Sequence, residues 1–365
     1  MNNKSQLIEK DNKFLIDSLI NNITEINEKI KLFEETNKED KILKERQINK
    51  INEFENKIKK IEDFHVKFKF KNFNLMNICS KKVHNNYIMS MAVFPSGNII
   101  SVSKDKSIKI YDNRLNILQY IQNAHEDLIG CVNIKDENNF VTCSNDKNIK
   151  TWIKKENQFE INQIIENAHN QIIRKVIYYL DNKLISCSYD TTIKIWEEKN
   201  NNYQNIFTLN HSKEVFSILL LKDKNILVSS GNDRTSFWNL NKNELILNFN
   251  DTLCNSGNAL CRINEDKIIV QGKNHSLKVI SITQKKIIYE IEYYLNSWGI
   301  FSIENKGIFL VGGNSKDIRI YRNDNYECIQ IIKNAHYSNI LGFIELKNGN
   351  VASYGWDQII KIWSF

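Results

Sequence analysis

Long apolar runs are absent from this chain. The opening residues Met1–Gln6 lead into no hydrophobic stretch, so neither a signal peptide nor a membrane span is expected. The seven cysteines show no Cys-x-x-Cys spacing, and their odd number indicates reduced thiols. Both absences favour a cytoplasmic location, with the nucleus as the alternative.

Catalytic and metal-binding motifs are absent as well. There is no phosphate-binding P-loop, no Gly-x-Ser-x-Gly and no His-Glu-x-x-His. Cys254 and Cys261 lie seven residues apart without a nearby histidine pair, whereas a structural zinc ion normally needs four ligands. The sequence therefore predicts no metal site and no cofactor.

Clustered positive charge is also lacking. Lys and Arg number 50 against 43 Asp and Glu, which gives a net charge of +7. Residues 1–62 hold 13 of each sign, so the excess is spread over the rest of the chain. Nucleic-acid-binding proteins more often carry basic stripes interleaved with aromatic residues. Because no such stripe is visible, we expect no nucleic-acid partner.

What the sequence does contain is a repeat. Five histidines are each followed 27 residues later by an aromatic residue; the pairs are His84 with Tyr111, His125 with Trp152, His169 with Trp196, His211 with Trp238, and His336 with Trp363. An aspartate follows each histidine after 21 residues, or 22 in the fourth case: Asp105, Asp146, Asp190, Asp233 and Asp357. A hydroxyl residue lies four positions before each aspartate: Ser101, Thr142, Ser186, Ser229 and Ser353. Self-similarity of this length indicates a propeller or a solenoid.

Each repeat contains two short runs with alternating apolar residues, which predict strands. Residues 184–188 and 192–196 are an example, with a turn at Tyr189-Asp190 between them. The segments 186–196, 103–112 and 356–363 share this strand–turn–strand form and end in Ile-Lys-Ile followed by Tyr or Trp. In these segments the chain resembles the WD40 family. The resemblance implies four-stranded blades arranged around a channel.

The His, Ser/Thr, Asp and Trp set is interpreted as a buried polar network. Burying an unpaired carboxylate costs several kcal/mol, so the aspartate needs partners. The family pattern implies that histidine donates to aspartate and contacts the hydroxyl, which meets the indole N–H. A hydrolase triad uses the same residue types, but active sites are rarely multiplied around a ring. We therefore predict a non-enzyme.

Two further repeats lack this set. Residues 268–280 carry Asn274, Val270 and Ile280 where the others have aspartate, hydroxyl and tryptophan, and residues 310–321 carry Ser315 and Val311. Counting them gives seven blades within residues 63–365, with a strand near residues 66–80 expected to complete the last blade, because open sheet edges are avoided. The predicted fold class is an all-β seven-bladed propeller with an N-terminal helical segment.

Residues 1–62 show a helical pattern instead. They contain neither Gly nor Pro, and apolar residues recur at Ile16, Leu19, Ile23, Ile26, Ile30 and Phe33, then at Ile51, Phe54, Ile58 and Ile61. The same heptad positions are polar at Asn37, Asp40, Lys44 and Gln47. One long helix and a hairpin turning near residues 35–38 both fit this pattern. We favour coiled-coil homodimerisation, with a hairpin or a docked helix as the alternative.

The resemblance also implies which residues face the upper mouth of the ring. Carried over position by position, the candidate partner-binding residues are Tyr87, Met89, Lys104, Leu128, Arg174, Tyr189, Phe216, Lys273, Leu341 and Trp356, with Trp298 or Phe301 in the sixth blade. Aromatic and Arg side chains dominate binding hot spots. We expect an interaction scaffold that binds protein partners here, specifically a peptide with an apolar anchor and an acidic or phosphorylated group facing Arg174.

The same arrangement is similar to ubiquitin-ligase or autophagy substrate receptors and to G-protein beta subunits. These remain alternatives. No F-box, RING or Phe-Arg-Arg-Gly motif is present, which disfavours a complete ligase subunit and a phosphoinositide-binding propeller.

Overall fold

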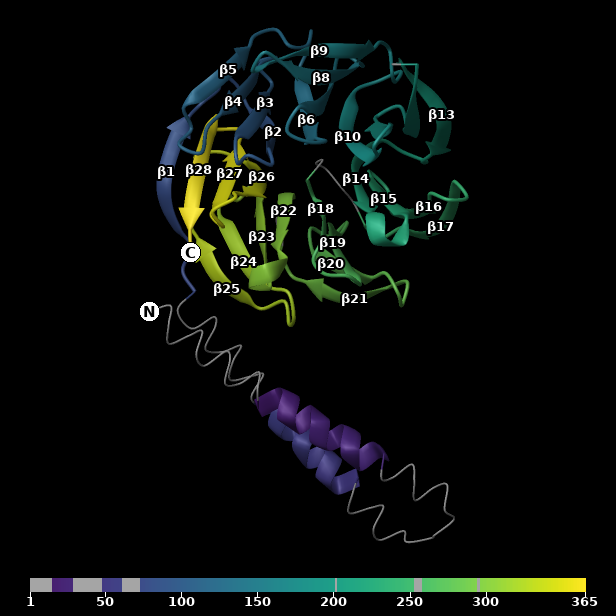
Figure 1. The fold of residues 1–365 in the computed structure, drawn as a ribbon, viewed down its shortest axis with the longest axis vertical. Coiled ribbons are helices and arrows are strands. Elements are labelled where there is room, and N and C mark those ends of the chain that lie inside the picture. Colours follow the sequence, from purple (N-terminus) through teal and green to yellow (C-terminus); the bar gives the residue numbers. More distant parts are fainter. Residues whose placement is uncertain (1–14, 29–47, 61–72, 201, 253–257, 294–295) are drawn as a thin grey trace. The chain divides into compact units, whose positions relative to one another are not determined.

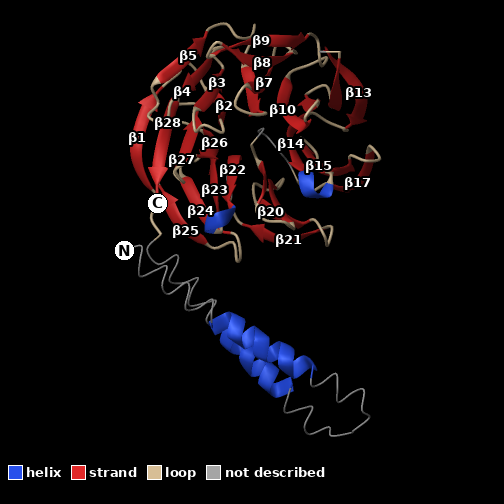
Figure 2. Cartoon of the chain, viewed as in Figure 1, coloured by secondary structure: helices blue, strands red, loops and turns tan. Residues whose placement is uncertain are grey.

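The computed structural model describes residues 15–28, 48–60, 73–200, 202–252, 258–293 and 296–365. By its internal contacts the chain divides into two compact units, Met1–Asn74 and Leu75–Phe365. The first unit is helical and the second is built of strands (Figure 2).

In the second unit, the described residues form seven antiparallel sheets of four strands each, arranged as a ring (Figure 1). The predicted seven-bladed propeller is thus confirmed. Two short 3-10 turns, η1 (Lys222–Lys224) and η2 (Glu304–Lys306), connect strands in blades 4 and 6.

Each blade runs from an inner strand to an outer one in chain order. Blades 1 to 3 comprise β2 (Ile88–Val93), β3 (Ile99–Ser103), β4 (Ile108–Tyr111), β5 (Ile117–Ile121); β6 (Ile129–Ile134), β7 (Asn139–Ser144), β8 (Ile149–Lys155), β9 (Gln158–Ile165); and β10 (Ile173–Leu180), β11 (Lys183–Ser188), β12 (Thr192–Lys199), β13 (Asn202–Asn210).

The remaining blades follow the same order, except that the outer strand of the last one comes from the start of the unit. Blades 4 to 7 comprise β14 (Val215–Leu221), β15 (Ile226–Gly231), β16 (Thr235–Asn239), β17 (Glu244–Phe249); β18 (Leu260–Arg262), β19 (Lys267–Gln271), β20 (Leu277–Ser281), β21 (Lys286–Ile291); β22 (Ser297–Ile303), β23 (Ile308–Gly313), β24 (Ile318–Arg322), β25 (Cys328–Ile332); and β26 (Ile340–Glu345), β27 (Val351–Gly355), β28 (Ile359–Ser364), β1 (Met76–Lys82).

The hydrophobic core lies between neighbouring blades. Strands such as β3 and β27 are buried at every residue because adjacent sheets cover both of their faces. One core cluster joins Ile99 and Tyr111 of blade 1 to Ala352 and Ile360 of blade 7. The outer strand β5, in contrast, is largely exposed. Serines such as Ser101 and Ser353 are buried together with the apolar residues of these doubly covered strands.

Both ends of the second unit belong to one sheet. β1 pairs antiparallel with β28, from Met76 opposite Ser364 to Lys82 opposite Ile359. The backbone N–H of Leu75 also donates to Gln330 Oε1 of blade 6 at 2.9 Å. Of the segment near residues 66–80 expected to close the ring, residues 66–72 lie outside the described residues.

The tight turn between the second and third strands of a blade places one residue in the left-handed backbone region. In blades 1, 2, 3 and 7 this residue directly follows the aspartate of the repeat: Lys106, Lys147, Thr191 and Gln358, with φ between 67° and 69°. Non-glycine residues adopt such angles only where the surroundings fix them. The turn of blade 4, which has one residue fewer between Asp233 and Trp238 than the other repeats, contains no such residue among those described.

The first unit contains helices over residues 15–28 and 48–60 (Figure 2). The predicted heptad positions face away from solvent: Ile16, Leu19 and Ile23 are half-buried, and so are Ile51, Phe54 and Ile58. Ile26 is only 7% exposed, so other residues of this same chain cover the stripe. Because the apolar heptad positions are covered within one chain, this burial favours the hairpin or docked-helix alternative over a coiled coil formed by two chains through these positions.

Other predictions for this segment lie outside the described residues, namely the apolar positions Ile30, Phe33 and Ile61 and the polar interruption at Asn37, Asp40, Lys44 and Gln47. In the parts of the chain that the structure describes, no helix has the length and apolar character needed to cross a membrane.

Candidate functional site

The predicted polar network is present in blade 3 with every expected link. His169 Nδ1 lies 2.9 Å from Asp190 Oδ2, and His169 Nε2 lies 2.7 Å from Ser186 Oγ. Trp196 Nε1 donates to the same Ser186 Oγ at 2.8 Å. Because a carboxylate only accepts, the proton on this histidine belongs on Nδ1, and Nε2 accepts from the serine hydroxyl. Each polar group of this blade 3 network then has a hydrogen-bond partner.

Blades 1, 2 and 7 repeat this geometry. The histidine-to-aspartate and histidine-to-hydroxyl distances are 2.9 and 2.7 Å for His84–Asp105 and His84–Ser101, 2.8 and 2.8 Å for His125–Asp146 and His125–Thr142, and 2.8 and 2.6 Å for His336–Asp357 and His336–Ser353. The aromatic partners reach the hydroxyls at 3.1 Å from Tyr111, 2.9 Å from Trp152 and 2.8 Å from Trp363.

These histidines are closed to substrate. His84, His125, His169 and His336 are at most 1% exposed. Burial lowers the pKa of His84, His125 and His169, although the adjacent aspartates oppose the shift. Burial would raise the pKa of Asp190, but hydrogen bonds from His169 and Thr192 outweigh it and hold this pKa well below its usual range. The network therefore fixes the strand turns and offers no reactive group to solvent.

Blade 4 requires a correction, because the expected link between His211 and Ser229 is wrong. His211 Nε2 instead contacts Ser236 Oγ at 3.0 Å, and its Nδ1 has no hydrogen-bond partner. Asp233 accepts from the Ser212 hydroxyl, and its Oδ1 lies 3.5 Å from His211 Nδ1 without a hydrogen bond, whereas the contact from Trp238 Nε1 to Ser229 Oγ, 2.8 Å, is kept. The turn has one residue fewer between Asp233 and Trp238 than in the other repeats, and the carboxylate lies farther from the imidazole ring. Burial lowers the pKa of this histidine to about 4.

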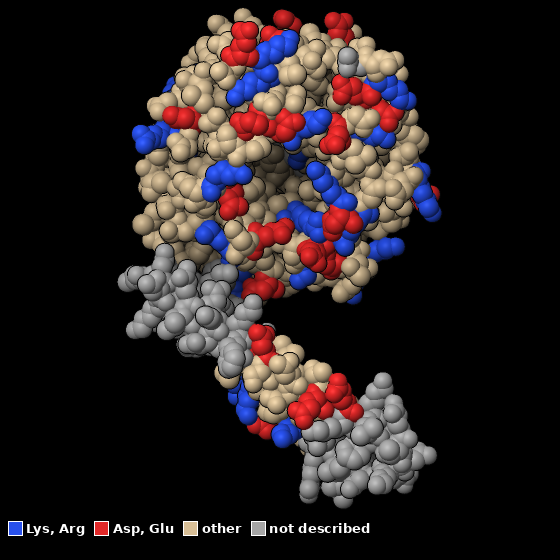
Figure 3. Space-filling model, viewed as in Figure 1, with Lys and Arg blue, Asp and Glu red and all other residues tan. Residues whose placement is uncertain are grey.

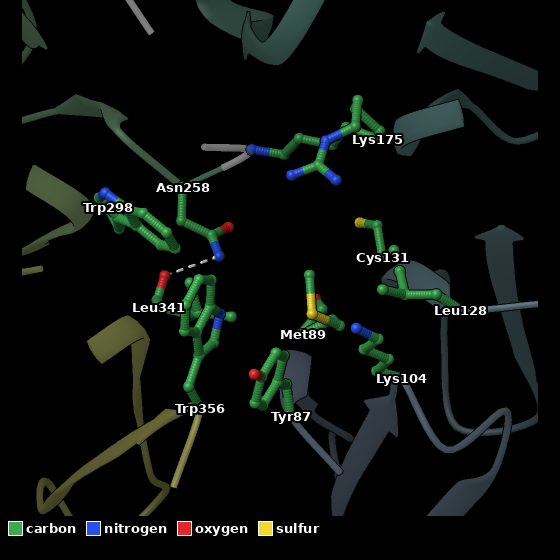
Figure 4. A pocket seen from close by; sticks show the side chains of 13 residues that line it. Tyr87, Met89, Lys104, Leu128, Cys131, Lys175, Asn258, Trp298, Leu341 and Trp356 are labelled. Carbon is green, nitrogen blue, oxygen red and sulfur yellow. Dashed lines mark hydrogen bonds between the residues drawn. The ribbon is translucent and has the colours of Figure 1, made fainter. Parts of the chain in front are cut away.

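A cavity of about 430 Å³ opens at the mouth of the ring. Figure 4 shows the side chains around it, whereas Figure 3 shows the opposite face of the ring, where acidic and basic residues surround a central hollow. Eight of the predicted partner-binding residues line it: Tyr87, Met89, Lys104, Leu128, Arg174, Trp298, Leu341 and Trp356. We call this cavity the upper cup.

Three aromatic side chains form one wall of the upper cup. The rings of Tyr87 and Trp356 stack with centroids 4.7 Å apart, and Trp298 meets Trp356 edge-on at 4.7 Å. These contacts assign the mouth position of blade 6 to Trp298 instead of Phe301. Lys104 Nζ lies 5.1 Å from the centroid of the Tyr87 ring.

The other predicted residues fall into two groups. Tyr189 and Phe216 do not line the cup, but their rings lie 5.5 and 5.8 Å from the Arg174 guanidinium carbon. Lys273 of blade 5 does not line the cup. Its backbone N–H donates to Asp251 O in the loop that follows β17.

A family model described as WD domain, G-beta repeat matches residues 77–112, 116–152 and 162–197. The first match begins in β1, in the sheet of blade 7, and continues through three strands of blade 1, as the ring closure requires. Combined with the seven four-stranded blades, this match is decisive. The chain is a WD40-repeat propeller. A search of curated proteins finds no match. WD40 propellers are in general non-catalytic scaffolds for protein interactions.

Degenerate blades of this WD40 propeller contain acidic groups that the sequence did not predict. In blade 5 the Glu290 carboxylate accepts from Asn274 Nδ2 at 2.7 Å and from Ser276 Oγ at 2.6 Å. In blade 6 the buried Asp317 accepts from the backbone N–H of Asn334 at 2.9 Å. In blade 5 a carboxylate from another strand thus satisfies the turn, and in blade 6 the carboxylate at the end of the turn binds the loop that follows β25.

The sequence analysis also missed the deeper residues of the upper cup, Ser90, Cys131 and Lys175. Each lies six positions after the histidine of its repeat, one residue beyond Met89, Gly130 and Arg174. This shared repeat position was the available signal. Asn258, which also lines the cup, donates from Nδ2 to Leu341 O at 3.0 Å and lies 3.3 Å from the Tyr354 hydroxyl, so its side chain connects blade 5 with blade 7.

Removing one aspartate tests whether the network stabilises the WD40 propeller. Asp190→Ala leaves His169 and two backbone N–H groups without an acceptor and is expected to lower the free energy of unfolding by about 3–5 kcal/mol. Asp233→Ala is the matched control: its carboxylate lacks the histidine hydrogen bond, and the expected loss is about 1 kcal/mol. Urea unfolding followed by tryptophan fluorescence measures both, and equal losses would contradict the network interpretation.

The buried histidines make stability depend on pH. The pKa values of His84, His125, His169 and His211 are lowered in the folded state, so the unfolded chain binds protons first as the pH falls below about 6.5. Stability is therefore fully present above pH 6.5 and is lost progressively below it. The aspartates, whose pKa values are also lowered, add a further loss below about pH 4. Urea midpoints between pH 8 and pH 4 measure this trend; a midpoint that rises on acidification would refute it.

Proposed function

We propose that the upper cup binds an extended peptide that carries an apolar anchor beside an acidic or phosphorylated group. The observation that carries this proposal is the composition of the cup wall. Lys104, Arg174 and Lys175 line it, whereas Asp and Glu are absent from the described lining residues.

The aromatic wall supports the apolar half of the ligand. Trp298, Trp356 and Tyr87 contact one another from blades 6, 7 and 1, and Met89, Leu128 and Leu341 lie around them. An exposed concave surface of this kind on a rigid fold is typical of a partner site. Since aromatic side chains lose little conformational entropy on binding, they suit a peptide anchor.

Arg174 supports the anionic half. Its guanidinium lies over the rings of Tyr189 and Phe216, and no ion pair to it is found among the described residues. The rings contact the face of the guanidinium by cation–π attraction. Its N–H donors, which point outward in the plane of the group, remain for an incoming anion. Carboxylate and phosphate groups match this geometry, and phosphate carries the larger charge.

Peptide binding to the full chain tests this proposal. A peptide with Trp or Leu next to a phosphoserine is expected to bind, and its neutral serine version to bind at least about tenfold more weakly, or about 1.4 kcal/mol. Arg174→Glu should abolish this difference, and Trp356→Ala should weaken both peptides. Fluorescence anisotropy gives the affinities.

Lys273→Glu is the matched control, because it makes a comparable change of charge on a lysine outside the cup. An equal loss of affinity in Lys273→Glu and Arg174→Glu would show that general charge, and not the cup, attracts the peptide. Equal binding of the neutral and phosphorylated peptides to the unaltered chain would refute the anionic half.

We also propose that the helical segment of residues 1–62 mediates self-association or docking. Its heptad stripe is covered within the chain, but Ile20 and Ile48 remain 47% and 42% exposed. Two exposed isoleucines in a small helical unit favour contact with a second copy or a partner helix.

Light scattering of the full chain tests self-association. We expect a dimer that becomes a monomer in Ile20→Glu, whereas Asn21→Glu, an exposed polar position on the same helix, should leave the dimer intact. A monomer at every concentration in the unaltered chain would remove self-association from the proposal and leave docking.

A further inference from the structure

Two cysteines face each other on neighbouring strands of blade 2. Cys131 of β6 is the direct register partner of Cys143 of β7. Directly opposed residues of an antiparallel pair have their Cβ atoms on the same face of the sheet, about 4.5–5.5 Å apart. The Cα spacing of such pairs lies inside the range that a disulfide spans.

Both sulfur atoms lie against the same strand of the next blade. Cys131 Sγ is 3.8 Å from Val176 O, and Cys143 Sγ is 3.8 Å from Ile173 O, both in β10. The two thiols therefore occupy one layer between blades 2 and 3. A hydrogen bond from the Cys143 thiol, together with the Lys175 cation, lowers the pKa of Cys131.

Only one of the two thiols can be reached from outside. Cys131 lines the upper cup, and Figure 4 shows its side chain at the hollow that Lys175 and Met89 also border. Cys143 is fully buried behind it and is not among the lining residues. Cys187 of blade 3 is equally buried and lines no part of the cup, so it provides an internal comparison.

We propose that Cys131 and Cys143 form a redox-modifiable dithiol, with Cys131 as the thiol that reacts through the upper cup and Cys143 as the resolving thiol. The oxidant is a small hydroperoxide such as hydrogen peroxide, which fits the cavity. This site does not depend on the peptide proposed as the ligand of the cup.

The reaction takes two steps. The Cys131 thiolate attacks one oxygen of hydrogen peroxide, the O–O bond breaks, and hydroxide leaves, which gives a sulfenic acid on Cys131. The Cys143 sulfur, as it gives up its proton, then attacks the Cys131 sulfur; an S–S bond forms, the S–O bond breaks, and water leaves. The two thiols lose two electrons in total and the peroxide gains them. A small thiol reductant reverses the product by thiol–disulfide exchange.

Peptide mapping of the full chain tests the proposal. Trypsin places the three cysteines in separate peptides, residues 115–135, 136–147 and 184–194. After treatment of the folded protein with hydrogen peroxide, the non-reducing map should contain peptide 115–135 joined to peptide 136–147, with the loss of two hydrogen atoms. Dithiothreitol should remove this species, and peptide 184–194 should stay unmodified.

Two variants separate the roles of the thiols. Cys143→Ser should stop the reaction at the sulfenic acid, which dimedone traps on Cys131, and Cys131→Ser should leave Cys143 unreacted. Circular dichroism checks that both variants fold. The proposal is overturned if the unaltered chain shows no joined peptide, or if Cys187 is oxidised as readily as Cys131.

Discussion

Four largely buried carboxylates, one in each of blades 1, 2, 3 and 7, hold much of this structure together through the hydrogen bonds that they accept. In blades 1, 2, 3 and 7, an aspartate at the end of a tight turn receives bonds from a histidine ring and from backbone N–H groups. The histidine then hydrogen-bonds to a Ser or Thr hydroxyl, and this hydroxyl also hydrogen-bonds to the Trp or Tyr at the end of the repeat. Each link exists because the previous group would otherwise be buried without a partner. The turn, and with it the mouth residue just before the aspartate, is held in place by this chain of contacts.

The same dependence explains the limits of reading this fold from its sequence. The spacing of histidine, hydroxyl, aspartate and tryptophan predicted the network in four blades, since those distances are properties of the strand lengths. It gave the wrong partner for His211, because the turn between Asp233 and Trp238 is one residue shorter than in the other repeats, and a residue pattern does not show how this changes the backbone. Glu290 was missed because it lies in β21 and only the folded backbone brings it near the turn, and Asp317 was missed because its partner Asn334 lies in the loop after β25.

The upper cup, too, was predictable from the sequence only in part. Residues at the upper mouth follow from the repeat register, and most of them meet at the cup. The register did not tell which neighbours cross from blade to blade: Arg174 lies over rings from blades 3 and 4, and Trp356 of blade 7 contacts Tyr87 of blade 1 and Trp298 of blade 6. The cup is thus shared among blades that are far apart in the chain, and its cationic character arises from two repeats, with Lys104 from blade 1 and Arg174 and Lys175 from blade 3.

The pairing of β1 with β28 places a constraint on how the chain assembles. Lys82 precedes its partner Ile359 by 277 residues, so blade 7 stays incomplete until nearly all of the chain is available. The other six sheets pair strands that are consecutive in the chain, so each can form as it is synthesised. Pairing β1 with β28 instead closes a very long loop, and this closure costs conformational entropy. During that interval the edge of β1 is unpaired, and its own residues Met76 and Ile78 are exposed. Translation speed and chaperone access are therefore most important for this protein between the emergence of its first strand and that of its last.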